Sequence, residues 1–557
     1  MKSVRIFCEN TQTHYTCQPG TTLYELASRM HLRMTSDILA AWVNNQLKDL
    51  SYEIYVEQTV RFIDIAHPDG IRTYQRSLSF LCQKAVRDVL PDYRLAIKHP
   101  ISRGLYGEIT CNGQPADKPL LKKVNARMRE LVQMNIPFVR VRKETDEAIR
   151  LFDRNGQHEK ALLQKTRGRF YTTIYYLDDY PDCFYGPLVY STGYLTVFEL
   201  CRYHDGILLR MPKADKPRRL ESKPKQAKLF RIFQQHKDWN RILGATNIGS
   251  LNELIQGNQI RPLILVAEAL QEREYVSLAK HIQQRHDRIK LALLAGPSSS
   301  GKTTTAKRLG IQIKLAGLNP VAIELDNYFV DREKTPRDAN GRYDFDSIDA
   351  LDLDLLNTHL RALLRGQTIT PPYFNFISGR RRPSGHELRI RPHDLLILEG
   401  IHALNPKLTE GVDRANKFQI YASALTSIAM DENNRISTTD NRLIRRIVRD
   451  ARTRGYSAAQ TIAQWSSVRR GEDRYIFPFQ EQADIMFNSA LLYELAVLRR
   501  YAAPLLHRIL PVDPSYAEAL RLLKFLSYFE MIAPDDESTI PSTSVLREFI
   551  GGSCFDY

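Results

Sequence analysis

Apolar and polar positions alternate along the chain with two different periods. In residues 4–9 and 60–65 every second side chain is apolar, which predicts two strands. In residues 21–30, between them, the apolar side chains follow the spacing of one helical face. We therefore expect residues 1–65 to form a small domain of strands with one helix.

The patterns change three more times along the chain. Strand and helix signals mix over residues 66–212, where residues 125–156 read as one helical stretch. A Lys-, Arg- and Pro-rich segment follows and predicts an exposed basic connector, after which helical spacing resumes. Beyond it, strands alternate with helices, which predicts a doubly wound parallel sheet. The expected units are 1–65, 66–212 (α+β), 213–285 (connector), 286–500 (α/β) and 501–557 (helical extension and tail).

Composition narrows the classes of function. The chain has 557 residues and a net charge of +16, which favours anionic ligands such as nucleotides, phosphorylated metabolites or RNA without choosing among them. Its seven cysteines are scattered and form no C-x-x-C pair, so neither a disulfide framework nor a zinc knuckle is indicated. There is no signal core and no run of 18 apolar residues. We expect a cytoplasmic protein with no membrane partner.

A phosphate-binding pattern, G-x-x-x-x-G-K-[ST], follows an apolar run at residues 289–295 and opens a helix-like segment. Its glycines let backbone N–H groups at a helix N-terminus wrap around phosphates. Lys302 brings charge to the β- and γ-phosphates, and the Thr303 hydroxyl can hold Mg²⁺. The residues expected to bind ATP are Gly296, Pro297, Ser298, Ser299, Ser300, Gly301, Lys302, Thr303 and Thr304.

Two acidic residues follow predicted strands of the same sheet. The strand PVAIEL is expected to end at Asp326 and the strand DLLIL at Glu399. Ligands of parallel sheets lie at the carboxyl ends of the strands, so both side chains should face the phosphate loop. Asp326 is the better candidate to accept a proton from an attacking hydroxyl, and Glu399 could order Mg²⁺ through water.

A basic helix is predicted over TDNRLIRRIVRDARTRG, where four arginines recur at spacings of three and four and so share one helix face. A salt-bridged surface stripe needs acidic partners at the same spacing, and this helix offers mainly Asp450. We therefore expect an arginine-rich lid that closes on the transferring phosphate. Its four arginines are Arg442, Arg445, Arg446 and Arg449.

The phrases GPSSSGKTTT, ELDNYF, YDFDSIDALD and DNRLIRRIVRDARTRG resemble the uridine kinase and phosphoribulokinase family of P-loop kinases, over residues 287–498. The resemblance implies that Asp326 is the catalytic base and that Asp346 binds sugar hydroxyls. It also implies catalytic roles for Lys302, Arg446 and Arg449. Arg446 and Gln464 match lid positions that face substrate or phosphate.

Three positions depart from that family's pattern. Phe374 and Gly379 stand where uridine kinases have a Tyr and a His that contact the pyrimidine, and Tyr456 replaces a lid arginine that meets the nucleoside. Phe374 is therefore a candidate substrate contact of altered chemistry. We expect sugar binding to be kept and base selection to be weakened.

The front of the chain carries two further resemblances. PGTTLYELA and LAAWVNNQLKDL resemble the TGS domain, a ubiquitin-like β-grasp module, and TYQRSLSFLCQKAV and DCFYGPLVYSTGY resemble the editing domain of threonyl-tRNA synthetases. Those synthetases carry a His-x-x-x-His pair, a Cys and a His at four places where this chain has other residues. Cys201 and His204 are offset from these places, and we expect them to have structural roles. No zinc and no editing are expected, because the four places hold Arg76, Phe80, Phe184 and Leu188.

The leading hypothesis is a kinase that uses ATP and Mg²⁺ to phosphorylate the primary hydroxyl of a nucleoside, giving the 5′-monophosphate and ADP. One alternative is a kinase of a non-nucleoside, ribose-like metabolite. Another, from a different class, is a nucleotide-driven regulator linked to RNA or the ribosome. Asp326 and Asp346 favour a kinase, since a switch needs neither a substrate base nor a sugar clamp. RNA binding and homo-oligomerisation stay open.

Overall fold

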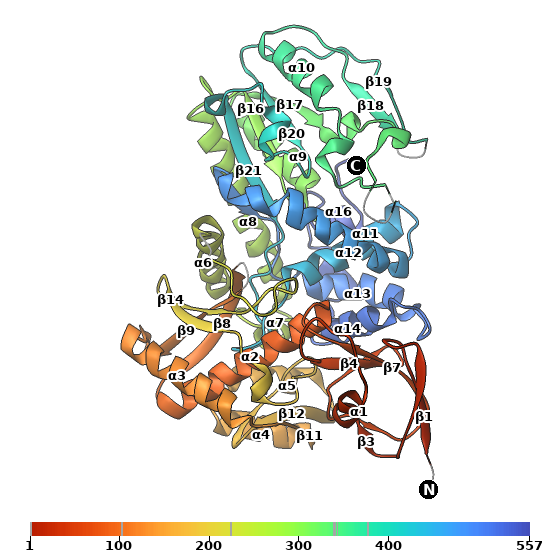
Figure 1. The fold of residues 1–557 in the computed structure, drawn as a ribbon. Coiled ribbons are helices and arrows are strands. Elements are labelled where there is room, and N and C mark those ends of the chain that lie inside the picture. The colour runs from red at the N-terminus through yellow and green to blue at the C-terminus, as the bar shows by residue number, and fades with distance from the viewer. Residues whose placement is uncertain are drawn as a thin grey trace.

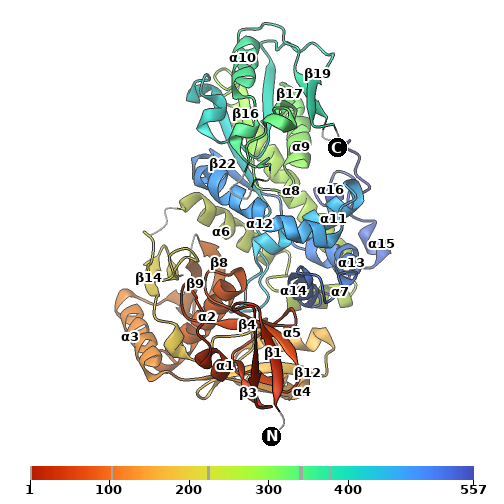
Figure 2. The same cartoon turned by 45° about the vertical axis from the view of Figure 1, so that its right-hand side comes forward.

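The computed structural model describes residues 3–101, 104–222, 226–337, 341, 343–375 and 378–556. Figure 1 shows the first 210 residues at one end of the molecule and a parallel sheet with its helices at the other. Helices α13 (Glu494–His507) and α14 (Tyr516–Leu526) lie between the two ends, as both views show (Figures 1 and 2). No helix within the described ranges is long and apolar enough to cross a membrane.

The first domain is a mixed sheet crossed by one helix, the β-grasp arrangement expected for it. Strands β1 and β7 pair in parallel at its centre, and the other neighbours are antiparallel. Helix α1 (Leu23–Arg29) starts at a capping box in which Thr22 and Glu25 satisfy each other's backbone N–H groups, and it buries Leu23 and Leu26. The sheet order β2-β1-β7-β4-β5 comprises Val4–Cys8 (β1), Thr13–Cys17 (β2), Ala40–Val43 (β4), Gln46–Lys48 (β5) and Gln58–Ile63 (β7), and β3 (Thr21–Thr22) pairs with β6 (Glu53–Ile54).

The second domain packs helices against two antiparallel sheets. Its larger sheet runs β10-β9-β15-β14 with β8 beside β9, and its smaller sheet runs β11-β12-β13. The strands are Arg94–Ile101 (β8), Gly104–Cys111 (β9), Gln114–Pro115 (β10), Phe138–Glu144 (β11), Tyr171–Leu177 (β12), Tyr180–Asp182 (β13), Glu199–Tyr203 (β14) and Gly206–Arg210 (β15). The helices are Pro68–Val89 (α2), Lys118–Met134 (α3), Thr145–Arg154 (α4) and His158–Arg167 (α5).

The prediction of one helical stretch over residues 125–156 is wrong. Helix α3 ends at Asn135, whose left-handed conformation (φ 52°) closes the helix, and Pro137 follows two residues later. The chain then forms strand β11, paired along its length with β12, before α4 begins. The periodicity changes from helix to strand and back inside this stretch.

The connector contains three helices after its basic segment. Residues 223–225 of its basic segment lie outside the described residues. Helices α6 (Ala227–Ile242), α7 (Ile248–Gln256) and α8 (Ile260–Gln283) carry the chain to the sheet, as the helical spacing predicted.

The next domain is a five-stranded parallel sheet in the order β17-β20-β16-β21-β22, which confirms the expected P-loop α/β fold. Alternate side chains of its strands pack against α8 and α9 on one face and against α6 and α10 on the other. The strands are Leu291–Ala295 (β16), Asn319–Glu324 (β17), Asp394–Glu399 (β20), Lys417–Ser423 (β21) and Ile485–Asn488 (β22). Around them lie Lys302–Leu315 (α9), Leu353–Leu364 (α10), Thr438–Thr453 (α11), Ala458–Tyr475 (α12) and the hairpin of Pro372–Asn375 (β18) and Arg380–Pro383 (β19).

The last 50 residues are part of the body of the protein. Helices α14, α15 (Pro534–Glu537) and α16 (Arg547–Ile550) follow α13, and residues of α14 and α16 lie fully buried in one hydrophobic cluster with α7, α8, α11 and α13. Figure 1 places the C-terminus beside the parallel-sheet domain, far from the N-terminus.

Candidate functional site

The phosphate loop leaves the central strand β16 and ends where α9 begins at Lys302. Ser299 (φ 58°) and Gly301 (φ 75°) adopt left-handed conformations, which curl the loop around its own amides. At Gly296 an added Cβ would lie 2.0 Å from the carbonyl oxygen of Ala422, so only glycine fits.

Two hydroxyl groups of this loop are buried without a partner. The Oγ atoms of Ser299 and Ser300 make no hydrogen bond within the described part of the chain. Buried donors in native proteins are almost always satisfied, so unpaired hydroxyls beside a helix N-terminus fit a bound phosphate. The unpaired donors of the loop therefore fit the phosphate groups of a nucleotide.

The first turn of α9 meets the end of β20. Thr303 Oγ1 lies 3.4 Å from Glu399 Oε2, so a hydroxyl and a carboxylate converge where Mg²⁺ was expected, and both are the oxygen ligands that this ion prefers. Burial raises the pKa of Glu399 to about 7, an effect that Lys302 opposes and that Asp326 and Glu548 reinforce. These residues therefore share one electrostatic environment.

Asp326 lies two residues beyond β17, in the short 3₁₀ turn Leu325–Tyr328, so the strand ends at Glu324 rather than at Asp326. Its side chain keeps contact with solvent. The protein around the carboxyl still raises its pKa, and Lys302, Arg454 and Arg449 counteract the rise. Asp326 thus stands among cations next to the phosphate loop.

Asp346 lies close to helix α12. Helix α12 approaches it so closely that a Cβ at Gly471 would lie 2.6 Å from the Asp346 Cβ. Burial raises the pKa of Asp346 to about 6, and Arg446 opposes the rise. Arg446 also donates to the Ser298 hydroxyl of the phosphate loop (2.8 Å), so it links the loop to Asp346.

The expectation of a four-arginine lid is wrong for Arg442 and Arg445. Both are fully buried on α11: Arg442 pairs with Glu472 of α12, and Arg445 pairs with Glu494 at the start of α13. Their acidic partners come from other helices, which the spacing within α11 does not reveal. Arg446 and Arg449 remain half-buried, and Arg449 is 2.8 Å from Asp450.

Two of the three positions that depart from the kinase pattern lie in the hairpin of β18 and β19, and the third follows α11. Phe374 is buried, and its ring lies 5.6 Å from that of Phe329, three residues after Asp326. Gly379 adopts a left-handed conformation (φ 68°) in the turn between β18 and β19. Tyr456 is 40% exposed after α11, and Gln464 is exposed on α12.

Sequence reasoning missed two residues at this site. Arg454 follows α11 and opposes the rise in the pKa of Asp326. Its place about one helical turn beyond Asp450 could have indicated that it belongs to the same cluster. Glu548 lies 244 positions beyond Thr304, yet its Oε2 accepts a hydrogen bond from Thr304 Oγ1 at 2.6 Å. Local sequence patterns do not predict a contact between residues so far apart in the chain.

The four places compared with the synthetase metal site lie in or beside a packed interior. Phe80, Phe184 and Leu188 are buried in one hydrophobic cluster, where the rings of Phe80 and Phe184 lie 5.1 Å apart. Arg76 donates to the Pro187 carbonyl (2.9 Å) and to Thr73 Oγ1 (3.0 Å). Among the described residues no three His, Cys, Asp or Glu side chains are grouped to hold a metal ion.

Taken together, a parallel sheet, a phosphate loop after its central strand and acidic side chains at the strand ends define a P-loop kinase. The model of the "Phosphoribulokinase / Uridine kinase family" matches residues 292–494. A uridine kinase of Halobacterium salinarum is 30% identical over 194 residues, which cover 35% of this chain and 77% of that one. The chain belongs to the phosphoribulokinase/uridine kinase family.

The front half is similar to part of a different enzyme. A threonine–tRNA ligase of Methylobacillus flagellatus is 30% identical over 182 residues, which cover 32% of this chain but only 28% of the ligase. This similarity lies in the N-terminal region. Among solved structures, a possible uridine kinase from Bacillus stearothermophilus is 18% identical, with a TM-score of 0.27, over 39% of this chain and 98% of that one.

Proposed function

We propose that this protein is an ATP-dependent kinase that phosphorylates the primary hydroxyl of a ribonucleoside, giving the 5′-monophosphate and ADP. The observation that carries the proposal is the position of Asp326, which shares its electrostatic surroundings with Lys302 and Arg449 beside the phosphate loop. A hydroxyl between this carboxylate and the loop would meet a proton acceptor on one side and a phosphate on the other.

Each side chain then has a defined task. As the hydroxyl oxygen bonds to the γ-phosphorus and the bond to ADP breaks, Asp326 takes the hydroxyl proton. Lys302, Arg446 and Arg449 place positive charge around the transferring group. Thr303 and Glu399 would hold Mg²⁺, which supplies charge neutralisation at the β- and γ-phosphates.

The substrate's sugar is assigned to Asp346. Its carboxylate lies against α12 with Arg446 nearby, and it can grip vicinal hydroxyls through charge-assisted hydrogen bonds. The base would meet aromatic carbon rather than polar groups, because Phe374 is buried against Phe329 and the place of the family's His is Gly379. We therefore expect ribonucleosides to be used well above 2′-deoxynucleosides, with modest differences among bases.

Steady-state kcat/KM values for uridine, cytidine, adenosine, inosine and deoxyuridine test the substrate. Equal use of uridine and deoxyuridine would exclude the role given to Asp346. Strong preference for uridine over the purine nucleosides would mean that other residues read the base. Activity with ribose-like sugars alone would favour the non-nucleoside alternative.

Asp326→Asn tests the mechanism. It should lower kcat by about 10²- to 10⁴-fold, the usual contribution of a general base, while the ADP affinity measured by calorimetry stays within about twofold of wild type. Asp354→Asn, at an exposed carboxylate on α10, is the matched control and should change neither quantity. Equal losses in kcat and ADP affinity would make Asp326 a metal-holding or structural residue instead.

For the front half we propose a TGS-like domain over residues 1–65 and an editing-like domain without its metal over residues 66–212. The second candidate function, an RNA- or ribosome-linked regulator, is favoured by the similarity to a threonine–tRNA ligase and by the net charge of +16. A screen of nucleosides and sugars for ATP consumption, run beside gel-shift titration with tRNA, separates the two. Tight tRNA binding with no acceptor-dependent ATP consumption would favour the regulator.

A further inference from the structure

The C-terminal segment, residues 541–556, returns to the phosphate loop. Figure 1 shows α16 and the C-terminus beside the parallel-sheet domain, and Figure 2 shows the same closeness after rotation. The contact is intimate, because a Cβ added to Gly301 would lie 2.4 Å from Val545 Cγ2. Glu548, three residues later, is 8% exposed.

The carboxylate of Glu548 binds the start of α9. Its Oε2 accepts from Thr304 Oγ1 at 2.6 Å and lies 3.4 Å from the Thr304 backbone nitrogen. Thr304 is the third residue of α9, so its N–H is one of the first amides of the helix, which have no intrahelical acceptor. In a phosphate loop these amides receive phosphate oxygens, and a carboxylate oxygen there uses the same donors.

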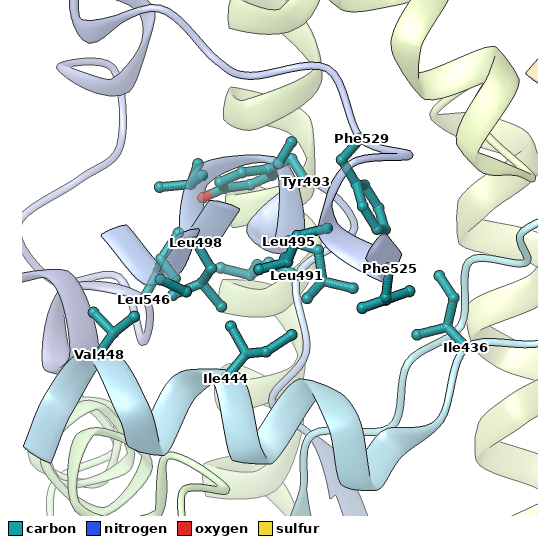
Figure 3. Close-up of a cluster of buried hydrophobic side chains, with 14 of the residues drawn as sticks. Ile436, Ile444, Val448, Leu491, Tyr493, Leu495, Leu498, Phe525, Phe529 and Leu546 are labelled. Atoms are coloured by element: carbon teal, nitrogen blue, oxygen red, sulfur yellow. The ribbon is translucent and has the colours of Figure 1, made fainter. Parts of the chain in front are cut away.

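Buried side chains hold the backbone of the segment on both sides of Glu548. Val545, Leu546 and Phe549 are fully buried. Figure 3 shows Leu546 packed near Val448 and Ile444 of α11. These contacts anchor the segment on both sides of Glu548.

Helix α11 also holds the two peptide groups that follow Glu548 in the chain. Arg452 donates to the carbonyl oxygens of Glu548 (2.8 Å) and Phe549 (3.1 Å), and the Arg445 guanidinium lies 4.9 Å from the Phe549 ring centre. The same helix carries Arg446, which bonds to Ser298 of the phosphate loop. The C-terminal segment, α11 and the phosphate loop therefore form one contact network.

We propose that Glu548 determines the nucleotide affinity of the site by occupying the position of a phosphate oxygen at Thr304. A nucleoside di- or triphosphate must displace this carboxylate before it engages the hydroxyl and amide of Thr304. The inference rests on the proposed function, because it takes the phosphate loop to be the ATP site. Glu548 thus weakens nucleotide binding, because its negative charge repels the phosphates and its carboxylate competes with them for the same hydrogen-bond donors.

Calorimetric titration of Mg·ADP into the full-length protein tests the proposal directly. Glu548→Gln removes the charge, and Glu548→Asp shortens the side chain away from Thr304 while keeping the charge. If the carboxylate-bound form makes up about 90% of the free protein, removing it should lower the Kd for ADP about tenfold. Asp535→Asn, at an exposed acid of the same C-terminal region, is the matched control and should leave the Kd unchanged.

The outcomes separate this inference from the proposed function. Tighter ADP binding by Glu548→Gln, with a smaller gain for Glu548→Asp and unchanged melting temperatures, supports it. Equal or weaker ADP binding by a folded Glu548→Gln variant overturns it while the kinase proposal stands. Absence of ADP binding in wild type and both variants overturns the kinase proposal and this inference together. Lys302→Ala in the Glu548→Gln background should abolish the gain, which locates the effect at the phosphate loop.

Discussion

The residues around the phosphate loop and those around Arg76 lie in different domains, and their polar groups are satisfied to different degrees. Around the phosphate loop, Ser299 and Ser300 are buried without partners, and the carboxyl groups of Asp346 and Glu399 have raised pKa values. At Arg76 the guanidinium is satisfied by a carbonyl and a hydroxyl. Its neighbours Phe80, Phe184 and Leu188 are apolar and packed.

This contrast separates a region whose buried polar groups await a partner from a region that is packed for stability. Unsatisfied donors and carboxylates with raised pKa values reduce stability, and such groups cluster where a ligand compensates for them. Around Arg76, by contrast, Phe80, Phe184 and Leu188 pack as hydrocarbon in one cluster. Four experiments test this contrast.

Lys302→Ala should have the largest effect on turnover, a loss of about 10³-fold or more, because it removes the charge that meets the transferring phosphate. Lys314→Ala, at an exposed position on the same helix, is the control. Both variants should melt like the wild type. Wild-type kcat in Lys302→Ala would remove the phosphate loop from the mechanism.

Phe80→Ala should cost about 3–5 kcal/mol in free energy of unfolding, since it opens a cavity in the packed cluster beside Arg76. Chemical denaturation followed by tryptophan fluorescence measures the loss, and Phe170→Ala, 87% exposed, serves as the control. A cost below about 1 kcal/mol, the range of a tolerated surface change, would mean that this cluster is not packed as the comparison requires.

Activity should fall as the pH is lowered from about 7.5 to 5.5, by roughly 100-fold, if Glu399 and Asp346 must both be ionised. Their pKa values, about 7 and about 6, are raised by burial, so protonation begins well above the range of ordinary carboxylates. The pH dependence of kcat/KM measures this, and Asp346→Asn should remove the lower of the two steps. A profile that stays flat down to pH 5 would contradict the assignment.

The smallest expected effect is on metal content at the front half. With Arg76, Phe80, Phe184 and Leu188 at the places compared with the synthetase metal site, the purified protein should carry no stoichiometric zinc and should not hydrolyse mischarged tRNA. Chelator treatment should leave its melting temperature unchanged. One tightly bound zinc per chain, measured by metal analysis, would contradict the conclusion that the residues around Arg76 bind no metal.

Much of this protein follows from local sequence alone. The strand, loop and helix around Lys302 could be predicted because glycine spacing, an apolar run and a helix start act within twenty residues. Asp326 and Glu399 could be assigned to one crevice because the carboxyl ends of parallel strands share one edge of a sheet. The expected helix over residues 125–156 failed because it spans two changes of period, at Asn135 and at the start of α4.

Only the tertiary structure decided which charges are free to act. Arg442, Arg445 and Arg446 are the same residue type on the same helix. Glu472 and Glu494, which other helices supply, neutralise the first two in the interior. Glu548 reaches Thr304 from 244 residues away because α16 is buried against α11. Periodicity reports which face of an element is apolar, whereas the partner across that face is selected by packing of the whole chain.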